Sequence, residues 1–303
     1  MRTLSCLAAG TLLLAAAFAG QPAAAQAQQG AGVFATQRGQ AQPPRFDEED
    51  RLAAIIASDR RSEADQARDV HRRPYEALTF WGLQPGMTIV EIEPGVGGWW
   101  TEILGPYAAE TQGQYIAAWI DLANPATSDA ARTARANLEQ RLADPRYGQG
   151  RAVNFGPQSG LDLPDGSADF ILVARAFHNW ARAEGRTDQY MSEFYRVLRP
   201  GGILAIEQHR AEEGLNVADT APTGYVPESY VIQAGQRAGF VLDGRSELNA
   251  NARDTRDHPF GVWTLPPVRR DSQDGRTLTE AERARFDAIG ESDRMTLRFR
   301  KPE

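Results

Sequence analysis

A glycine-rich turn and a carboxylate are the first residues whose types and spacing could do chemistry. The segment EIEPGVGG at 91–98 lies between a short β-rich run and a helical pattern. Glycines there let the backbone approach a ligand, and the start of a helix favours the ligand's negative groups. Asp121 ends the next β-rich run, where a carboxylate can accept both hydroxyls of a ribose. The two signals together predict a nucleotide-like ligand.

A second group of polar residues follows two later β-rich runs. His178 and Asn179 come after the fourth run, and Glu207 and His209 end the fifth. Open α/β sheets bind ligands at the carboxyl edge of their strands, so these side chains are candidate catalytic groups. His178, Glu207 and His209 could supply a base or a metal site. The alternative is a loop cap at His178 and a solvated His209, and we expect no metal.

The elements that must position these residues alternate between strands and helices. Strands are predicted at 87–92, 115–120, 151–155, 169–174, 202–207, 240–248 and 295–300, and helices at 62–70, 74–82, 99–109, after Ser128, at 189–198 and at 228–238. This alternation implies βαβ units and a mostly parallel sheet. The candidate residues then fall at the ends of neighbouring strands.

Two further motifs carry a resemblance to a known family. LPDGSADF at 163–170 is a turn that enters a buried strand, and RVLRPGG at 196–202 is a helix end, a turn and a strand start. With the acidic and glycine signals, this series resembles the class I S-adenosylmethionine-dependent methyltransferase family over about residues 75–210. GGWWT at 97–101 and FHNW at 177–180 are similar to a group of exported bacterial predicted methyltransferases.

The resemblance implies a fold and a cofactor. The fold is α/β and Rossmann-like, a doubly wound, mostly parallel seven-stranded sheet with helices on both faces and an antiparallel C-terminal strand. The cofactor is S-adenosylmethionine. Its methionine part would face the backbone at Gly95 and Gly97, Glu91 would order the loop, and Asp121 would hold the ribose.

Two positions depart from the family's pattern. Glu93 stands where the family usually has the first glycine of the loop, and its side chain could crowd or repel the cofactor's carboxylate. Ser159 stands where an acidic residue often contacts the adenine amine, and Asp162 is near enough to replace it. Both departures concern how tightly the cofactor binds and leave the expected fold unchanged.

Charge and composition exclude several other classes of protein. The 33 basic and 40 acidic residues give a net charge of −7, and no basic patch is longer than a pair of arginines, so we expect no nucleic-acid partner. Every basic residue is arginine except Lys301. P-loop phosphate binding and Schiff-base chemistry, which need a placed lysine, are therefore not expected.

The N-terminus predicts export. A charged start, an apolar run at 4–18 and three alanines at 23–25 are typical of a secretory signal peptide, here residues 1–25. That run is too short to cross a membrane, and no later one is longer. A flexible leader is expected at 26–45 and one methyltransferase-like domain at 46–303, in the periplasm or the medium. Because Cys6 is the only cysteine, cleavage would leave a chain that forms no disulfide.

These observations favour methyl transfer to a small-molecule or protein acceptor outside the cytoplasm. A non-catalytic binding module for a nucleoside-like ligand or a protein partner is the alternative, because the cofactor is made in the cytoplasm. A hydrolase has little support, since neither G-x-S-x-G nor H-E-x-x-H is present.

A long insertion of about forty-five residues, 249–293, separates the last two predicted strands. Segments of that length are usually functional. It holds HPFGVW at 258–263, an apolar patch that we expect to be too short for a core of its own, and a helix candidate at 279–289. Phe260 and Trp263 would wall the acceptor side of the pocket, or else cover an exposed edge strand.

Overall fold

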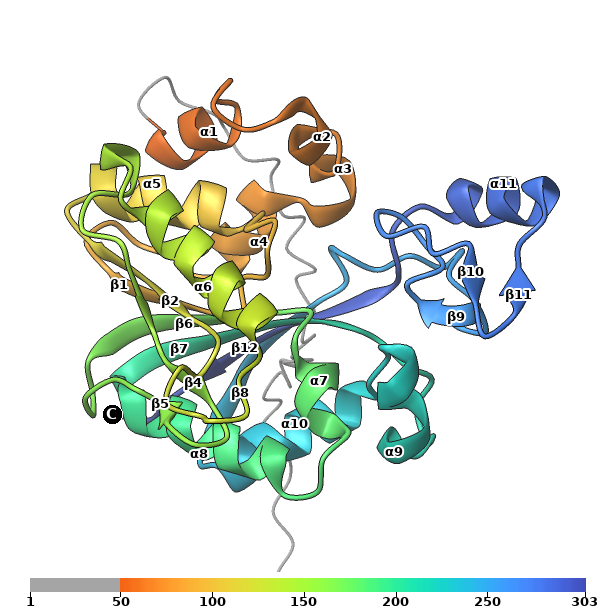
Figure 1. Ribbon diagram of the computed structural model, residues 1–303. Helices are drawn as coiled ribbons and strands as arrows, with labels where there is room; N and C mark the ends of the chain where they lie inside the picture. The colour runs from red at the N-terminus through yellow and green to blue at the C-terminus, as the bar shows by residue number, and fades with distance from the viewer. Residues whose placement is uncertain (1–49) are drawn as a thin grey trace, which may run out of the picture. The chain divides into compact units, whose positions relative to one another are not determined.

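Seven strands form the central sheet, in the order β3-β2-β1-β6-β7-β12-β8. The strands are β1 (Thr88–Ile92), β2 (Gln114–Ala118), β3 (Arg151–Val153), β6 (Ala168–Ala174), β7 (Leu198–His209), β8 (Val241–Ser246) and β12 (Arg294–Arg300). The first five pair in parallel, and β12 pairs antiparallel with both β7 and β8. The expected doubly wound α/β sheet with an antiparallel C-terminal strand is confirmed (Figure 1).

The computed structural model describes residues 50–303. The predicted signal peptide and leader lie outside the described residues, so the structure adds nothing to those two predictions. Within residues 50–303, no helix combines the length and the apolar character that a membrane span requires.

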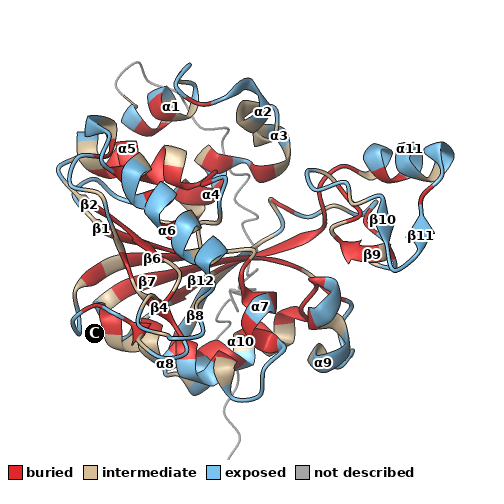
Figure 2. Cartoon of the chain, viewed as in Figure 1, coloured by how far each residue is buried: buried red, intermediate tan, exposed pale blue. Residues whose placement is uncertain are grey.

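Helices cover both faces of the sheet (Figure 1). One face carries α1 (Arg51–Ile56), α4 (Pro74–Trp81), α5 (Thr101–Glu110) and α6 (Asp129–Leu142), and the other carries α7 (Phe177–Ala181), α8 (Arg186–Val197) and α10 (Glu228–Arg237). The strand residues alternate between the two cores: Ile89 packs with the first group of helices and Val90 with the second. This period of two is what a strand buried on both faces requires, and Figure 2 shows the central strands β6, β7 and β12 mostly buried.

Local signals fix several helix ends as predicted. Pro74 is the first residue of α4, and Gly82 ends it with a left-handed φ of 84°, a conformation that glycine adopts without steric cost. Ser128 accepts a hydrogen bond from the backbone of Ala131 and so caps α6.

The helix predicted over 62–70 is wrong in one respect. Ser62 caps a helix as expected, but the chain forms two short helices, α2 (Glu63–Gln66) and α3 (Asp69–Arg72). Asp69 binds the buried guanidinium of Arg61 with two hydrogen bonds of 2.7 Å. This tertiary ion pair fixes the start of a second helix that the local pattern did not show.

The insertion between β8 and β12 has a core of its own, which corrects the expectation that its apolar patch was too short for one. It holds β9 (Pro259–Val262), the hairpin of β10 (Ser272–Gln273) and β11 (Arg276–Thr277), and α11 (Glu280–Ile289). Its buried cluster consists of Phe260, Leu265, Leu278 and Phe286. These residues lie far apart in the sequence, so the patch at 258–263 finds its partners only after the whole segment folds.

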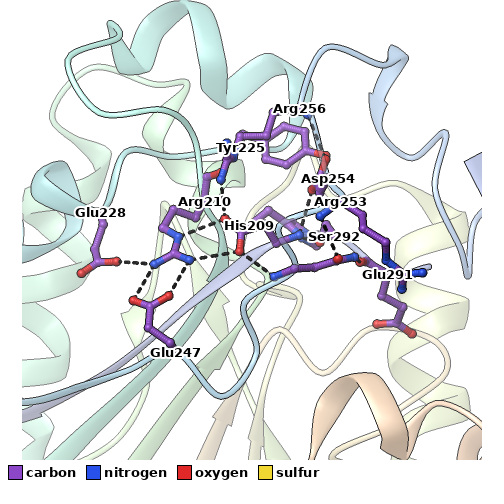
Figure 3. A network of polar contacts seen from close by, with 12 residues as sticks. His209, Arg210, Tyr225, Glu228, Glu247, Arg253, Asp254, Arg256, Glu291 and Ser292 are labelled. Atoms are coloured by element: carbon purple, nitrogen blue, oxygen red, sulfur yellow. Dashed lines mark hydrogen bonds and ion pairs between the residues drawn. The ribbon is translucent and has the colours of Figure 1, made fainter. Parts of the chain in front are cut away.

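A network of polar contacts binds the insertion to residues at the end of β7 (Figure 3). Arg210 donates two hydrogen bonds of 3.0 Å to Asp293 and two more to Glu247. Buried Asp254 accepts from the hydroxyl of Tyr225 and from the backbone N–H of Asp293. Asp254 and Asp293, near the two ends of the insertion, are therefore bound close together at the end of β7.

Candidate active site

A cavity of about 220 Å³ lies at the carboxyl ends of β1, β6 and β7. The insertion supplies part of its wall. The lining residues are Glu91, Glu93, Pro94, Gly95, Trp99, Trp100, Ala174, Arg175, His178, His209, Val262, Trp263, Pro266, Pro267, Val268 and Arg294. This is the edge at which open α/β sheets bind ligands.

The glycine loop leaves open space beside its backbone. A Cβ added at Gly95 or at Gly97 would meet no heavy atom of the described chain within 4 Å. Arg141, from α6, donates hydrogen bonds of 3.0 and 3.1 Å to the carbonyls of Gly97 and Val96. Arg141 therefore holds the loop on one side, and the space beside both glycines is open. Their contact with the methionine part of the cofactor stays a prediction.

Glu91 is buried behind this loop. Its carboxylate accepts hydrogen bonds from Tyr115, at 2.5 Å, and from Thr101, at 2.9 Å. Burial raises the pKa of Glu91 to about 7, against the effect of these two donors. Glu91 joins β1, β2 and the start of α5, a position that suits the predicted role of ordering the loop.

Glu93 lines the cavity and is bound by two side chains of α7. Its side chain accepts hydrogen bonds from Asn179, at 3.0 Å, and from Trp180, at 3.2 Å. Burial raises the pKa of Glu93 in spite of these donors. The predicted catalytic role of Asn179 is not supported, because the Asn179 amide binds Glu93 and the residue does not line the cavity.

The carboxylate of Asp121 is hydrogen-bonded by other groups of the protein. Its carboxylate accepts from the backbone N–H groups of Ala123, Gln158 and Ser159 and from the Ser159 hydroxyl, at 2.7 to 3.1 Å. Burial acts to raise its pKa, but the hydrogen bonds from Ser159 outweigh burial and leave the pKa below its ordinary value. Four donors fill the acceptor sites of a carboxylate. The predicted contact with a ribose therefore requires the turn at 157–159 to move.

Asp162 is exposed and lies outside the cavity. The amide of Asn154 lies 3.4 Å from its carboxylate, and the carbonyl of the same amide accepts from the backbone of Leu122. Asp162 is therefore tied, through one side chain, to the residue that follows Asp121. That location is compatible with the predicted contact with adenine, which stays a prediction.

His178 and His209 face each other across the cavity wall, with ring centroids 5.9 Å apart. Both are buried, which contradicts the alternative of a solvated His209. Burial lowers the pKa of His178 to about 4 and the pKa of His209 well below its ordinary value. Two neutral imidazoles therefore line the cavity at pH 7, each with the protonation state that a general base needs.

Glu207 is not at the cavity, which corrects its prediction as a catalytic residue. It is fully buried, and Arg294 donates to it at 3.0 Å. Arg294 also binds Glu291, which accepts in addition from Arg68 and Arg72. Across residues 50–303, no three His, Cys, Asp or Glu side chains are arranged to hold a metal ion. The alternative of a metal at His178, Glu207 and His209 has no support in this geometry.

Sequence reasoning missed Arg175 and Arg294, both of which line the cavity. Arg175 directly follows β6, so its place after a strand was a usable signal. Arg294 begins β12, which runs opposite to its neighbours and so brings its first residue to the carboxyl edge of β7. The predicted wall residue Trp263 does line the cavity, whereas Phe260 lies in the insertion's own core.

A family model described as a methyltransferase domain matches residues 98–206 of this chain. The matched range includes Asp121, His178 and the motifs at 163–170 and 196–202. A comparison with curated proteins found no match.

Solved structures share the fold at low sequence identity. The [4+2]-cyclase SpnF has a TM-score of 0.55 at 18% identity, over 81% of this chain and 86% of that chain. A SAM-dependent methyltransferase from Aquifex aeolicus has a TM-score of 0.46 at 19% identity, over 67% of this chain and 93% of that one. One from Methanosarcina mazei has a TM-score of 0.45 at 14% identity, over 74% and 96%.

The matched domain and the fold support a class I methyltransferase with S-adenosylmethionine as its cofactor. The same fold carries a cyclase in SpnF, so the reaction has to be argued from the site and not from the fold.

Proposed function

We propose that this protein is an S-adenosylmethionine-dependent methyltransferase that acts on a small-molecule or protein acceptor. One observation carries the proposal: a single cavity connects the open glycine loop to two neutral histidines. The cofactor supplies a methyl group on a sulfonium, whose leaving group is already activated. The chain then has to position the acceptor and to remove a proton from it where the acceptor carries one.

Different residues of the site would bind the cofactor and remove the acceptor's proton. Gly95 and Gly97 give room for the methionine part, and Asp121 and Asp162 would hold the nucleoside part. His209 would take the acceptor's proton, because it is uncharged and buried in the cavity wall, whereas Nδ1 of His178 faces the amide of Gln208. The cavity is smaller than the roughly 300 to 1,000 Å³ of pockets that bury a drug-sized ligand. The nucleoside therefore lies outside it, on the Asp121 side of the loop.

Calorimetry with S-adenosylmethionine and S-adenosylhomocysteine tests this proposal. A matched pair of variants sharpens the result, because Gly95 and Gly275 have similar φ values of 72° and 81° and equally open surroundings. Alanine at either position costs about 1 to 2 kcal/mol of stability through the left-handed backbone. We expect only Gly95→Ala to weaken S-adenosylhomocysteine binding, by at least tenfold. Absence of heat with both ligands at millimolar concentration would end the proposal.

A non-catalytic binding module remains the second candidate, because Glu93, which stands where the family usually has a glycine, lines the cavity. A module for another nucleoside-like ligand predicts heat with adenosine and none with either sulfur compound. The same titration therefore separates the two functions.

We also propose that the protein works outside the cytoplasm, on the strength of the signal-peptide pattern at 1–25. Cleavage after Ala25 would give a chain that starts at Gln26. N-terminal sequencing of protein from the periplasm or the medium of its native host checks this. A chain that keeps Met1 would contradict it.

A further inference from the structure

We propose that the acceptor is a small organic anion, a carboxylate or a similar group next to a flat apolar part, and that Arg175 binds the anionic group. This inference rests on the proposed function and specifies the substrate class of the same cavity. It depends on three features of the described residues: an arginine without an ion-pair partner, unpartnered N–H groups and an aromatic wall.

The charged residues beside the cavity are not all paired. Four arginines gather there with four carboxylates, Glu91, Glu93, Glu207 and Glu291. Glu291 accepts from Arg68, Arg72 and Arg294, and Glu207 accepts from Arg294. Arg175 is the fourth arginine, and within residues 50–303 it forms no ion pair with any carboxylate. Arg175 is therefore a cation at the cavity wall without a direct carboxylate partner among the described residues, and this marks a place for an anion.

The arginines also keep buried N–H groups without partners. Nε of Arg175, Nε of Arg294 and both Nη atoms of Arg72 are buried and donate to no acceptor of the described chain. A buried donor without a partner costs about 1 to 3 kcal/mol, and an unpaired buried charge costs more. An anion in the cavity would satisfy the two arginines that line it, Arg175 and Arg294.

The backbone holds Arg175 in an uncommon conformation. Its φ is 58°, in the left-handed region, which costs an arginine about 1 to 2 kcal/mol. Its N–H donates to the carbonyl of Glu207 at 2.7 Å, which fixes that conformation. Strain of this kind persists where the surrounding structure imposes it and concentrates at ligand sites. Here it places a guanidinium at the cavity wall.

Aromatic rings complete the wall and suit a flat apolar group. Trp99, Trp100 and Trp263 line the cavity. Its volume of about 220 Å³ exceeds the roughly 150 Å³ that suffices for benzene in an engineered protein cavity. Arg175 and His178 follow β6, and Trp263 comes from the insertion, whereas the glycine loop follows β1. The anion site therefore belongs to the acceptor side of the cavity and not to the cofactor loop.

Benzoate and benzamide test the proposal, because they share a shape and differ in charge. Each is titrated into the protein by calorimetry, with and without saturating S-adenosylhomocysteine. We expect benzoate to bind at least tenfold more tightly than benzamide. In Arg175→Gln that ratio should fall to about one, while the affinity for S-adenosylhomocysteine stays within twofold. The melting temperature should not fall, since Arg175 has no carboxylate partner to lose.

Arg237→Gln is the matched control. Arg237 is exposed and paired with Asp188 on α8, so its loss changes the net charge equally and should leave the benzoate preference intact. Equal binding of benzoate and benzamide to the natural protein would overturn the proposal. The proposal would also be overturned if Arg175→Gln weakened the binding of S-adenosylhomocysteine and left the preference for benzoate over benzamide unchanged. Arg175 would then bind the cofactor's carboxylate. If the protein preferred benzoate through Arg175 but did not bind S-adenosylhomocysteine, the proposed function would be refuted and the anion site would be supported.

Discussion

The Nδ1 atom of His209 lies 2.5 Å from the hydroxyl oxygen of Ser292, so a residue at the end of the insertion sets the orientation of an imidazole on β7 (Figure 3). Whichever way this hydrogen bond runs, it decides which nitrogen of the neutral ring carries the proton. If His209 is the base, Nδ1–H donates to Ser292, and the lone pair of Nε2 faces the cavity.

Nitrogen-15 NMR of the histidines checks this assignment. We expect His209 to be neutral with its proton on Nδ1 from pH 8 to pH 5, because its pKa is lowered by burial and by Arg294. In Ser292→Ala the preference for this tautomer should disappear. His178 should show the opposite tautomer, because its Nδ1 faces the amide nitrogen of Gln208 at 3.4 Å. A proton on Nε2 of His209 would make this ring a donor and rule it out as the base.

Glu91 should make the protein less stable as the pH rises. Its pKa is about 7 in the folded protein and 4.5 in the reference state, so between these values the folded state binds more protons and stability falls with increasing pH. Glu91→Gln should therefore raise the free energy of unfolding at pH 8, by up to about 3 kcal/mol from the size of the shift, and should change it little at pH 4. Urea unfolding at both pH values measures the difference.

Glu110→Gln serves as the control for Glu91. Glu110 is a surface residue paired with Arg51, and such pairs contribute about 1 kcal/mol or less. A stabilisation of Glu91→Gln that is equal at pH 4 and pH 8 would show that the carboxyl group does not titrate in this range.

Asp121 should contribute to stability as well as to binding. Asp121→Ala leaves the N–H groups of Gln158 and Ser159 without their acceptor, at about 1 to 3 kcal/mol for each buried group. We expect a lower melting temperature together with weaker S-adenosylhomocysteine binding. Ser159→Ala frees one carboxylate oxygen, and it should raise the affinity about threefold if that oxygen binds a ribose hydroxyl. Unchanged affinity in both variants would leave Asp121 a purely structural residue.

Alanine variants of Phe260 and Trp263 should have different effects on stability and on ligand affinity, although the two residues are only three positions apart. Phe260 belongs to the insertion's core, and Phe→Ala changes in a core cost about 3 to 5 kcal/mol. Phe260→Ala should therefore destabilise the insertion, seen as faster amide exchange over 257–290. Trp263 is partly exposed at the cavity wall, so Trp263→Ala should change ligand affinity with little loss of stability. Equal losses of stability in the two variants would contradict the assignment of Phe260 to the insertion's core and of Trp263 to the cavity wall.

The sequence predicted the strands and the glycine loop because their signals are local. A buried parallel strand is a short apolar run, and a glycine turn between a strand and a helix is contiguous. The roles of Asn179, Glu207 and Asp121 were harder to predict, since each side chain is bound by a partner brought to it by the fold: Glu93, Arg294 and Ser159. The burial of His209 depends in the same way on an insertion that returns from the far end of the chain.

The insertion has a core of its own, and its polar contacts with the end of β7 are made near its two ends, while Val262 and Trp263 pack against Ala211, Tyr225 and His178. Changes between 264 and 290 would therefore alter the cavity wall at Pro266, Pro267 and Val268 and keep those contacts in place. A related chain could therefore acquire a different acceptor by exchanging this segment alone, provided that Arg210, Asp254 and Asp293 are kept. Chimaeras made at those residues would transfer acceptor preference between proteins as a single module.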